Sequence, residues 1–160
     1  MVSDNPPPGL DATIQEARDW LETVMYDADG GECPACTQRV KVYRRSIHAA
    51  EARALILAVR AHDREWFHAP TFADVAQCGG SWAMLRRWAL IEEDNVPRAD
   101  GGRAGHWRVT ERGVQFAQRR LSVPKYALIY DNHLLGHEGD DVLITDALGD
   151  RFDYRELMSR

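Results

Sequence analysis

The chain has 160 residues, of which 44% are hydrophobic and 28% charged, a balance typical of one small globular domain with appendages. Its formal net charge of −5 excludes a protein that coats nucleic acid over its whole surface, although it permits a local basic face. No apolar run reaches the ~20 residues of a membrane span, so no membrane partner is expected. Three cysteines and no secretory signal indicate a cytoplasmic protein.

The first 46 residues predict a leader followed by a helix and a strand. Residues 1–10 contain three consecutive prolines and predict an extended, disordered leader. Residues 11–27 carry apolar side chains at helical spacing on one face. We expect this helix to pack on the body of the protein or to pair with a second copy in a homodimer. The alternating stretch 39–47 predicts a short strand, so that residues 11–46 form an N-terminal helix and cysteine knuckle.

Cys33 and Cys36 form a C-x-x-C motif, the spacing with which two thiolates reach one tetrahedral zinc ion. A structural zinc site needs four ligands, and the candidates for the other two are His48, His62, His68, Cys78 and His106. His68 and Cys78 flank one short predicted helix, so the expected ligand set is Cys33, Cys36, His68 and Cys78. Two reduced cysteines in a tight turn are the alternative, because a single C-x-x-C motif is not specific.

Residues 47–120 predict, element by element, a winged helix-turn-helix. A first helix follows Ser46, a short second helix starts at Thr71, and a pair of glycines forms the turn to a third helix that Ser81 caps. A glycine-rich loop between two strands then forms the wing, and Thr110 caps a final helix. The expected fold class is therefore α+β, with this domain between the N-terminal region and a C-terminal extension.

The third helix is the one that enters the major groove in a helix-turn-helix. Helical spacing predicts Trp82 and Arg86 on one exposed face with Arg87 beside them, and arginine is the usual bidentate partner of guanine. Arg103, at the tip of the wing, is expected to enter a minor groove. The predicted DNA-contacting residues are Ser81, Trp82, Arg86, Arg87, Arg103 and Arg108.

Residues 121–160 predict a small α+β extension. A hairpin turns at Asp131 and Asn132, residues 137–141 read as a polar turn, residues 142–144 predict a third strand, and short helices follow. The segment is too small for a core of its own, so we expect it to pack on the rest of the chain or on a second subunit.

The sequence favours a binding protein over an enzyme. It contains no nucleophile elbow, phosphate loop or dinucleotide fingerprint. Winged helices also dock proteins, and the third helix carries only two arginines. The alternative to a DNA-binding protein is therefore a module that binds a host or phage protein, with Trp82 and the C-terminal extension as its contact surface.

Two strings resemble the winged-helix regulators of the MarR and PadR type: LRRWALIE at 85–92 and WRVTERGVQF at 107–116. The second is similar to the wing strand of that family where it runs into an LT-x-x-G-x-x-F pattern. The layout of a CPxC knuckle, a KVYRR strand and a C-terminal FDYREL segment also resembles small proteins of bacteriophages and bacteria. These resemblances imply a transcriptional regulator of phage or mobile-element origin that binds double-stranded DNA.

Overall fold

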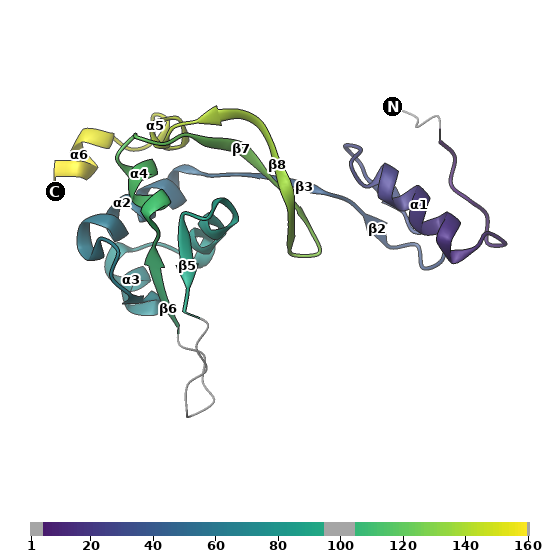
Figure 1. Cartoon of the computed structure of the whole chain (residues 1–160), viewed down its shortest axis with the longest axis horizontal. Coiled ribbons are helices and arrows are strands. Elements are labelled where there is room, and N and C mark those ends of the chain that lie inside the picture. The colour runs from purple at the N-terminus through teal and green to yellow at the C-terminus, as the bar shows by residue number, and fades with distance from the viewer. Residues whose placement is uncertain (1–4, 95–104, 160) are drawn as a thin grey trace, which may run out of the picture. The chain divides into compact units, whose positions relative to one another are not determined.

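The chain contains both helices and antiparallel strands, which confirms the predicted α+β class (Figure 1). The computed structural model describes residues 5–94 and 105–159. The chain forms two compact units: unit 1 comprises Met1–Arg44 with Leu128–Gly136, and unit 2 comprises Arg45–Ala127 with His137–Arg160. The predicted division into four segments, at residues 1–10, 11–46, 47–120 and 121–160, stays a prediction. Among the described helices, none is both long enough and apolar enough to cross a membrane.

Unit 1 is built around one helix and a two-stranded antiparallel ribbon. Its elements are α1 (Ile14–Val24), β1 (Gly31–Glu32) and β2 (Arg39–Val40). Helix α1 begins later than the predicted Asp11, because the Thr13 hydroxyl caps it by accepting a hydrogen bond from the Glu16 amide at 3.0 Å. Gly31 lies so close to Val24 that a Cβ would stand 2.3 Å from the valine Cγ2. This close approach holds the ribbon against the end of α1.

The middle of unit 2 combines four helices with a three-stranded sheet. Its elements are α2 (Ala49–His62), β4 (Phe67–His68), α3 (Ala69–Ala76), the 3-10 helix η1 (Gly80–Trp88), β5 (Ile91–Glu93), β6 (His106–Val109) and α4 (Glu111–Ala117). The strands have the order β4-β6-β5, and both pairs are antiparallel. Phe67 lies opposite Trp107, and Ile91 lies opposite Val109, so the buried side chains of the sheet share one face.

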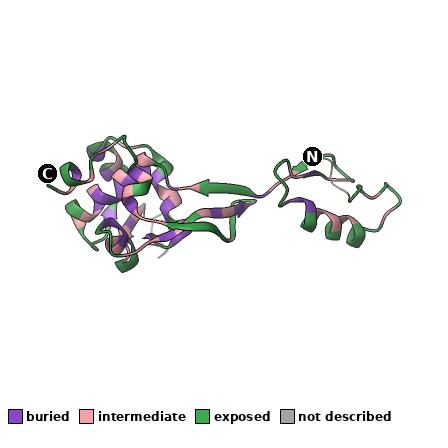
Figure 2. Cartoon of the chain, turned by 90° about the horizontal axis from the view of Figure 1, so that it is seen from above, coloured by how far each residue is buried: buried purple, intermediate pink, exposed green. Residues whose placement is uncertain are grey.

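Helix α2 is the centre of the core of unit 2. Its Ala52, Leu55 and Ile56 are almost completely buried, at helical spacing. The helix contacts η1 and α4, and also the C-terminal helices α5 (Ile144–Leu148) and α6 (Tyr154–Ser159). The prediction that the C-terminal segment packs on the rest of the chain is therefore confirmed. Most buried residues belong to unit 2, as Figure 2 shows.

A second sheet has the order β3-β7-β8, with β3 (Tyr43–Ser46), β7 (Val123–Tyr130) and β8 (His133–Val142). Asp131 and Asn132 join β7 to β8 with φ of 47° and 61°, as a type I′ turn requires, which confirms the predicted hairpin. Strand β8 continues through 137–141, so the predicted polar turn there is wrong. The predicted separate strand at 142–144 is also wrong. Pairing with β7 keeps β8 extended up to Val142, and α5 begins at Ile144.

Three helices start at other residues than predicted. Ser46, Thr71 and Ser81 were the expected caps, whereas the helices begin at Ala49, Ala69 and Gly80. Pro70 favours the first turn of a helix, which explains the earlier start of α3. Thr110 caps α4 as predicted, with its hydroxyl accepting a hydrogen bond from a backbone amide in the first turn.

Candidate nucleic-acid interface

The segment predicted to read DNA bases is η1, which is wound as a 3-10 helix rather than an α-helix. In a 3-10 helix, residues three positions apart lie above one another. Trp82, Leu85 and Trp88 therefore form one stripe, and all three are buried. The prediction that Trp82 shares an exposed face with Arg86 is wrong, because it assumed the four-residue spacing of an α-helix.

Trp82 is the centre of an aromatic cluster. Its ring centre lies 5.8 Å from that of Phe67, 5.6 Å from that of Phe72 and 5.5 Å from that of Trp107. These partners come from β4, α3 and β6, so one side chain ties η1 to the sheet and to the preceding helix. Trp82 is 5% exposed. It is therefore a core residue, and the prediction that it contacts bases or a partner protein does not fit its burial.

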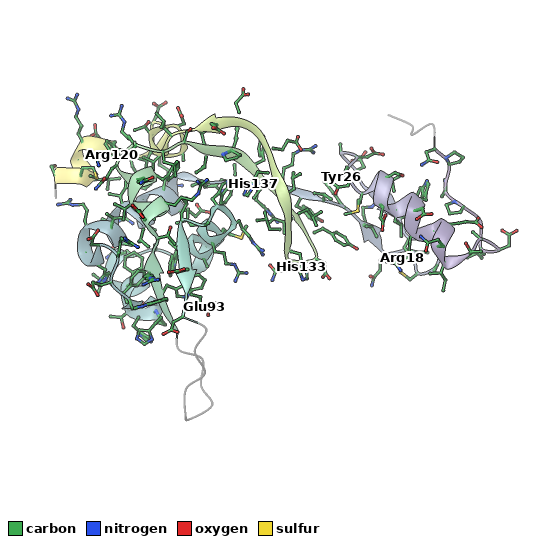
Figure 3. The ribbon with its side chains drawn as sticks, viewed as in Figure 1. Arg18, Tyr26, Glu93, Arg120, His133 and His137 are labelled. Atoms are coloured by element: carbon green, nitrogen blue, oxygen red, sulfur yellow. The ribbon has the colours of Figure 1, made fainter. Side chains whose placement is uncertain are left out.

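Arg87 is also withdrawn from the surface. It is 8% exposed, and burial together with the nearby charge of Arg86 lowers its pKa. His137 lies on β8 (Figure 3), and its ring donates from Nε2 to the Arg87 carbonyl at 2.8 Å. The Trp88 indole donates to the Pro124 carbonyl at 2.8 Å. The end of η1 is thus held by β7 and β8, and the expected place of Arg87 on an exposed face is wrong.

Three further residues were predicted to contact DNA, namely Ser81 and Arg86 on η1 and Arg103 on the wing. Ser81 and Arg86 are exposed on η1 and accessible to a ligand. Arg103 lies outside the described residues. Of the DNA contacts predicted on η1, two therefore remain accessible: the Ser81 hydroxyl near its start and the Arg86 guanidinium near its end.

Arg108 is engaged within the sheet. It lies opposite Glu92 in the antiparallel pair of β5 and β6, and the guanidinium Nε donates to the Glu92 carboxylate. The guanidinium also lies 4.5 Å from the centre of the Trp66 ring. Because its charge is already matched across the strands, Arg108 is placed to stabilise the sheet.

The start of α4 fixes the end of η1, and sequence reasoning did not assign this role. The Thr110 hydroxyl donates to the Ala89 carbonyl at 2.7 Å, and Arg112 Nε donates to the Trp88 carbonyl at 2.9 Å. Gly113 packs directly on the backbone that follows η1. The signal was present in the sequence, since all three residues belong to the string that resembles the winged-helix regulators. They act by positioning η1.

Charge is divided unequally between the two units. Unit 1 contains four basic and nine acidic residues, whereas unit 2 contains sixteen of each. The whole net charge of −5 therefore belongs to unit 1. The overall charge of a neutral unit 2 therefore does not oppose the binding of a polyanion.

The four predicted zinc ligands are divided between the units. Cys33 and Cys36 lie in the turn between β1 and β2, and His68 and Cys78 flank α3 in unit 2. His68 Nδ1 lies 2.8 Å from the Thr71 hydroxyl, and burial raises the pKa of Cys78. In the described ranges, no group of three or more His, Cys, Asp or Glu side chains is arranged to hold a metal ion. The predicted set of four ligands stays a prediction.

An apolar groove lies beside α2, β4 and α3. It encloses about 540 Å³, and its lining includes Leu57, Trp66, Phe72 and Val75. Val75 is 81% exposed and Trp66 is 41% exposed. Apolar side chains in the lining of this groove are thus open to solvent. Neither a family model, nor a curated protein, nor a solved structure matches the chain, so its function must be inferred from its own geometry.

Proposed function

We propose that unit 2 is a winged helix-turn-helix domain that binds duplex DNA, and that the protein is a transcriptional regulator of phage or mobile-element origin. Two strings of the domain resemble MarR- and PadR-type regulators, and the layout of the chain resembles small proteins of bacteriophages and bacteria. One observation carries the proposal. Helices α2, α3 and η1 are followed by the antiparallel strands β5 and β6, and β4 pairs with β6. A helix-turn-helix followed by a two-stranded wing is an arrangement that places the last helix in the major groove.

In this proposal Arg86 contacts the base edges in the major groove, and Ser81 positions η1 on the DNA phosphate backbone. The exposed Arg86 guanidinium donates two hydrogen bonds to guanine O6 and N7, and the Ser81 hydroxyl donates to a phosphate oxygen. Arg103 adds a contact from the wing to the minor groove. Trp82 and Arg87 support η1 from inside the unit, and Arg108 holds the sheet together.

Replacement of Arg86 by alanine tests this assignment. A bidentate arginine–guanine contact contributes about 1–3 kcal/mol of discrimination, so Arg86→Ala should weaken binding to a selected duplex by roughly 5- to 150-fold. Fluorescence anisotropy with a sequence selected from a random pool measures the change. Arg155→Ala is the matched control, because Arg155 is an exposed arginine on α6, and it should bind as the wild type does. Equal affinities of the two variants would contradict the role of Arg86.

A second candidate function is the docking of an apolar segment of another protein. The observation in its favour is the groove beside Trp66 and Val75, where apolar side chains are open to solvent. The contact surface would then be this groove and not Trp82. Val75→Asp should abolish such docking and leave DNA binding unchanged, so a pull-down and an anisotropy measurement on this one variant separate the two functions.

A further inference from the structure

The turn that carries Cys33 and Cys36 is closed at both sides by backbone hydrogen bonds. The Cys33 amide donates to the Gln38 carbonyl at 2.8 Å, and the Thr37 amide donates to the Cys33 carbonyl at 2.9 Å. Thr37 has a φ of 64°, the left-handed conformation that tight turns use. The turn is therefore a defined structure at the end of the β1–β2 ribbon, and it presents both cysteines together.

Backbone amides in this turn point at the sulfur of Cys33. The Cys33 sulfur accepts hydrogen bonds from the amides of Cys36 and Ala35 and from the Cys36 thiol. The contact between the two side chains also means that both sulfurs lie on the same side of the turn.

The turn of residues 33–38 between β1 and β2, here called the knuckle, is open to solvent. Cys36 is exposed and Cys33 is half-buried, and the flanking Ala35, Thr37 and Gln38 are exposed. A ligand or another protein surface can therefore approach both sulfurs. Unit 1 also exposes apolar side chains that a second surface would cover, namely Leu10 (89%), Ile14 (81%) and Tyr26 (49%).

We propose that this knuckle is half of a zinc site, which a second copy of the chain completes with its own Cys33 and Cys36. Zinc prefers four tetrahedral ligands and accepts four thiolates, and each knuckle supplies two of them. A two-fold axis through the metal brings identical pairs together, and this is the commonest symmetry of protein dimers. The inference does not depend on the function proposed for unit 2.

Formation of the site is an exchange of protons for a metal ion. Each thiol that enters the zinc shell loses its proton to solvent, so up to four protons leave as one Zn²⁺ binds between two chains. The sulfurs keep their oxidation state, and no oxidant or reductant takes part. The competing ligand set predicted from the sequence, with His68 and Cys78 beside the knuckle, would instead bind one metal per chain.

The test is metal binding by the full chain after treatment with a chelator and a reductant that contains no thiol. Cobalt(II) is added first, because its absorption reports tetrahedral thiolate ligation, and zinc is then added to displace it. We expect saturation at about one metal ion per two chains, and a doubling of the mass measured by light scattering when metal is added. Release of protons in weak buffer should accompany the doubling.

Single substitutions identify the ligands. Cys33→Ser and Cys36→Ser should each abolish both the cobalt absorption of the thiolate site and the doubling of mass. Cys78→Ser is the matched control and should keep both, as should His68→Ala. Saturation at one metal per chain without a change in mass would overturn the inference, as would failure of the wild-type chain to bind cobalt. Loss of the site in Cys78→Ser would also overturn it, in favour of the ligand set predicted from the sequence.

Discussion

Replacement of Trp82 by alanine should lower the free energy of unfolding by about 3–5 kcal/mol, the range observed for removal of a large buried aromatic side chain. Trp82 is 5% exposed, and it packs on Phe67, Phe72 and Trp107 within 5.8 Å between ring centres. Its removal leaves a cavity that the sheet and two helices cannot fill without moving. Urea denaturation followed by circular dichroism measures the loss.

Trp66→Ala is the matched control for this prediction. Trp66 is 41% exposed and contacts the guanidinium of Arg108, so its loss should cost only about 1 kcal/mol. Should Trp82→Ala prove too unstable to purify, Trp82→Phe keeps most of the apolar contact and should lose less than the alanine variant. Wild-type stability of Trp82→Ala with weaker DNA binding would contradict the account, because it would make Trp82 a surface residue that contacts bases.

Replacement of Gly113 by alanine should destabilise the chain by about 3 kcal/mol, at the upper end of the usual cost of overpacking. A Cβ at this position would stand 2.1 Å from the Leu90 carbonyl oxygen and 2.6 Å from Val109 Cγ1. The nearest atom belongs to the backbone, so α4 would have to move away from the end of η1. The bonds from Thr110 and Arg112 to that end would then be strained.

Gly80→Ala is the control for the effect of a methyl group in itself. A Cβ at Gly80 would meet no atom within 4 Å, so this variant should stay within about 0.5 kcal/mol of the wild type. Thermal unfolding of both variants gives the comparison. Equal stability of Gly113→Ala and Gly80→Ala would mean that α4 does not pack on η1 as described.

The order of elements in residues 47–120 was predictable because it depends on local signals. Apolar spacing marks α2, the glycines at 79 and 80 mark the turn before η1, and Thr110 marks the start of α4. Which side chains of η1 are buried and which are exposed was not predictable in this way. A change from 3.6 to 3 residues per turn moves Trp82 into the core, and nothing in the sequence of nine residues reports that change.

The partners of charged residues were equally hidden from the sequence. Arg108 and Glu92 are sixteen positions apart, and they meet only because β5 and β6 pair in this register. The full length of strand β8 was also not predictable from the sequence, because it too depends on strand pairing. Its residues 137–141 are polar and exposed, so no apolar alternation marks them, and they are extended because β7 lies beside them.

The binding of duplex DNA at increasing salt concentration tests the central proposal most directly. With the two cationic contacts of Arg86 and Arg103, the logarithm of the association constant of the full chain for random-sequence duplex should fall with the logarithm of salt at a slope of about −2. Selection from a random pool should then enrich a motif that contains guanine. Absence of binding at low salt, in a preparation shown to be folded, would contradict the proposal and favour docking of a protein in the groove beside Val75.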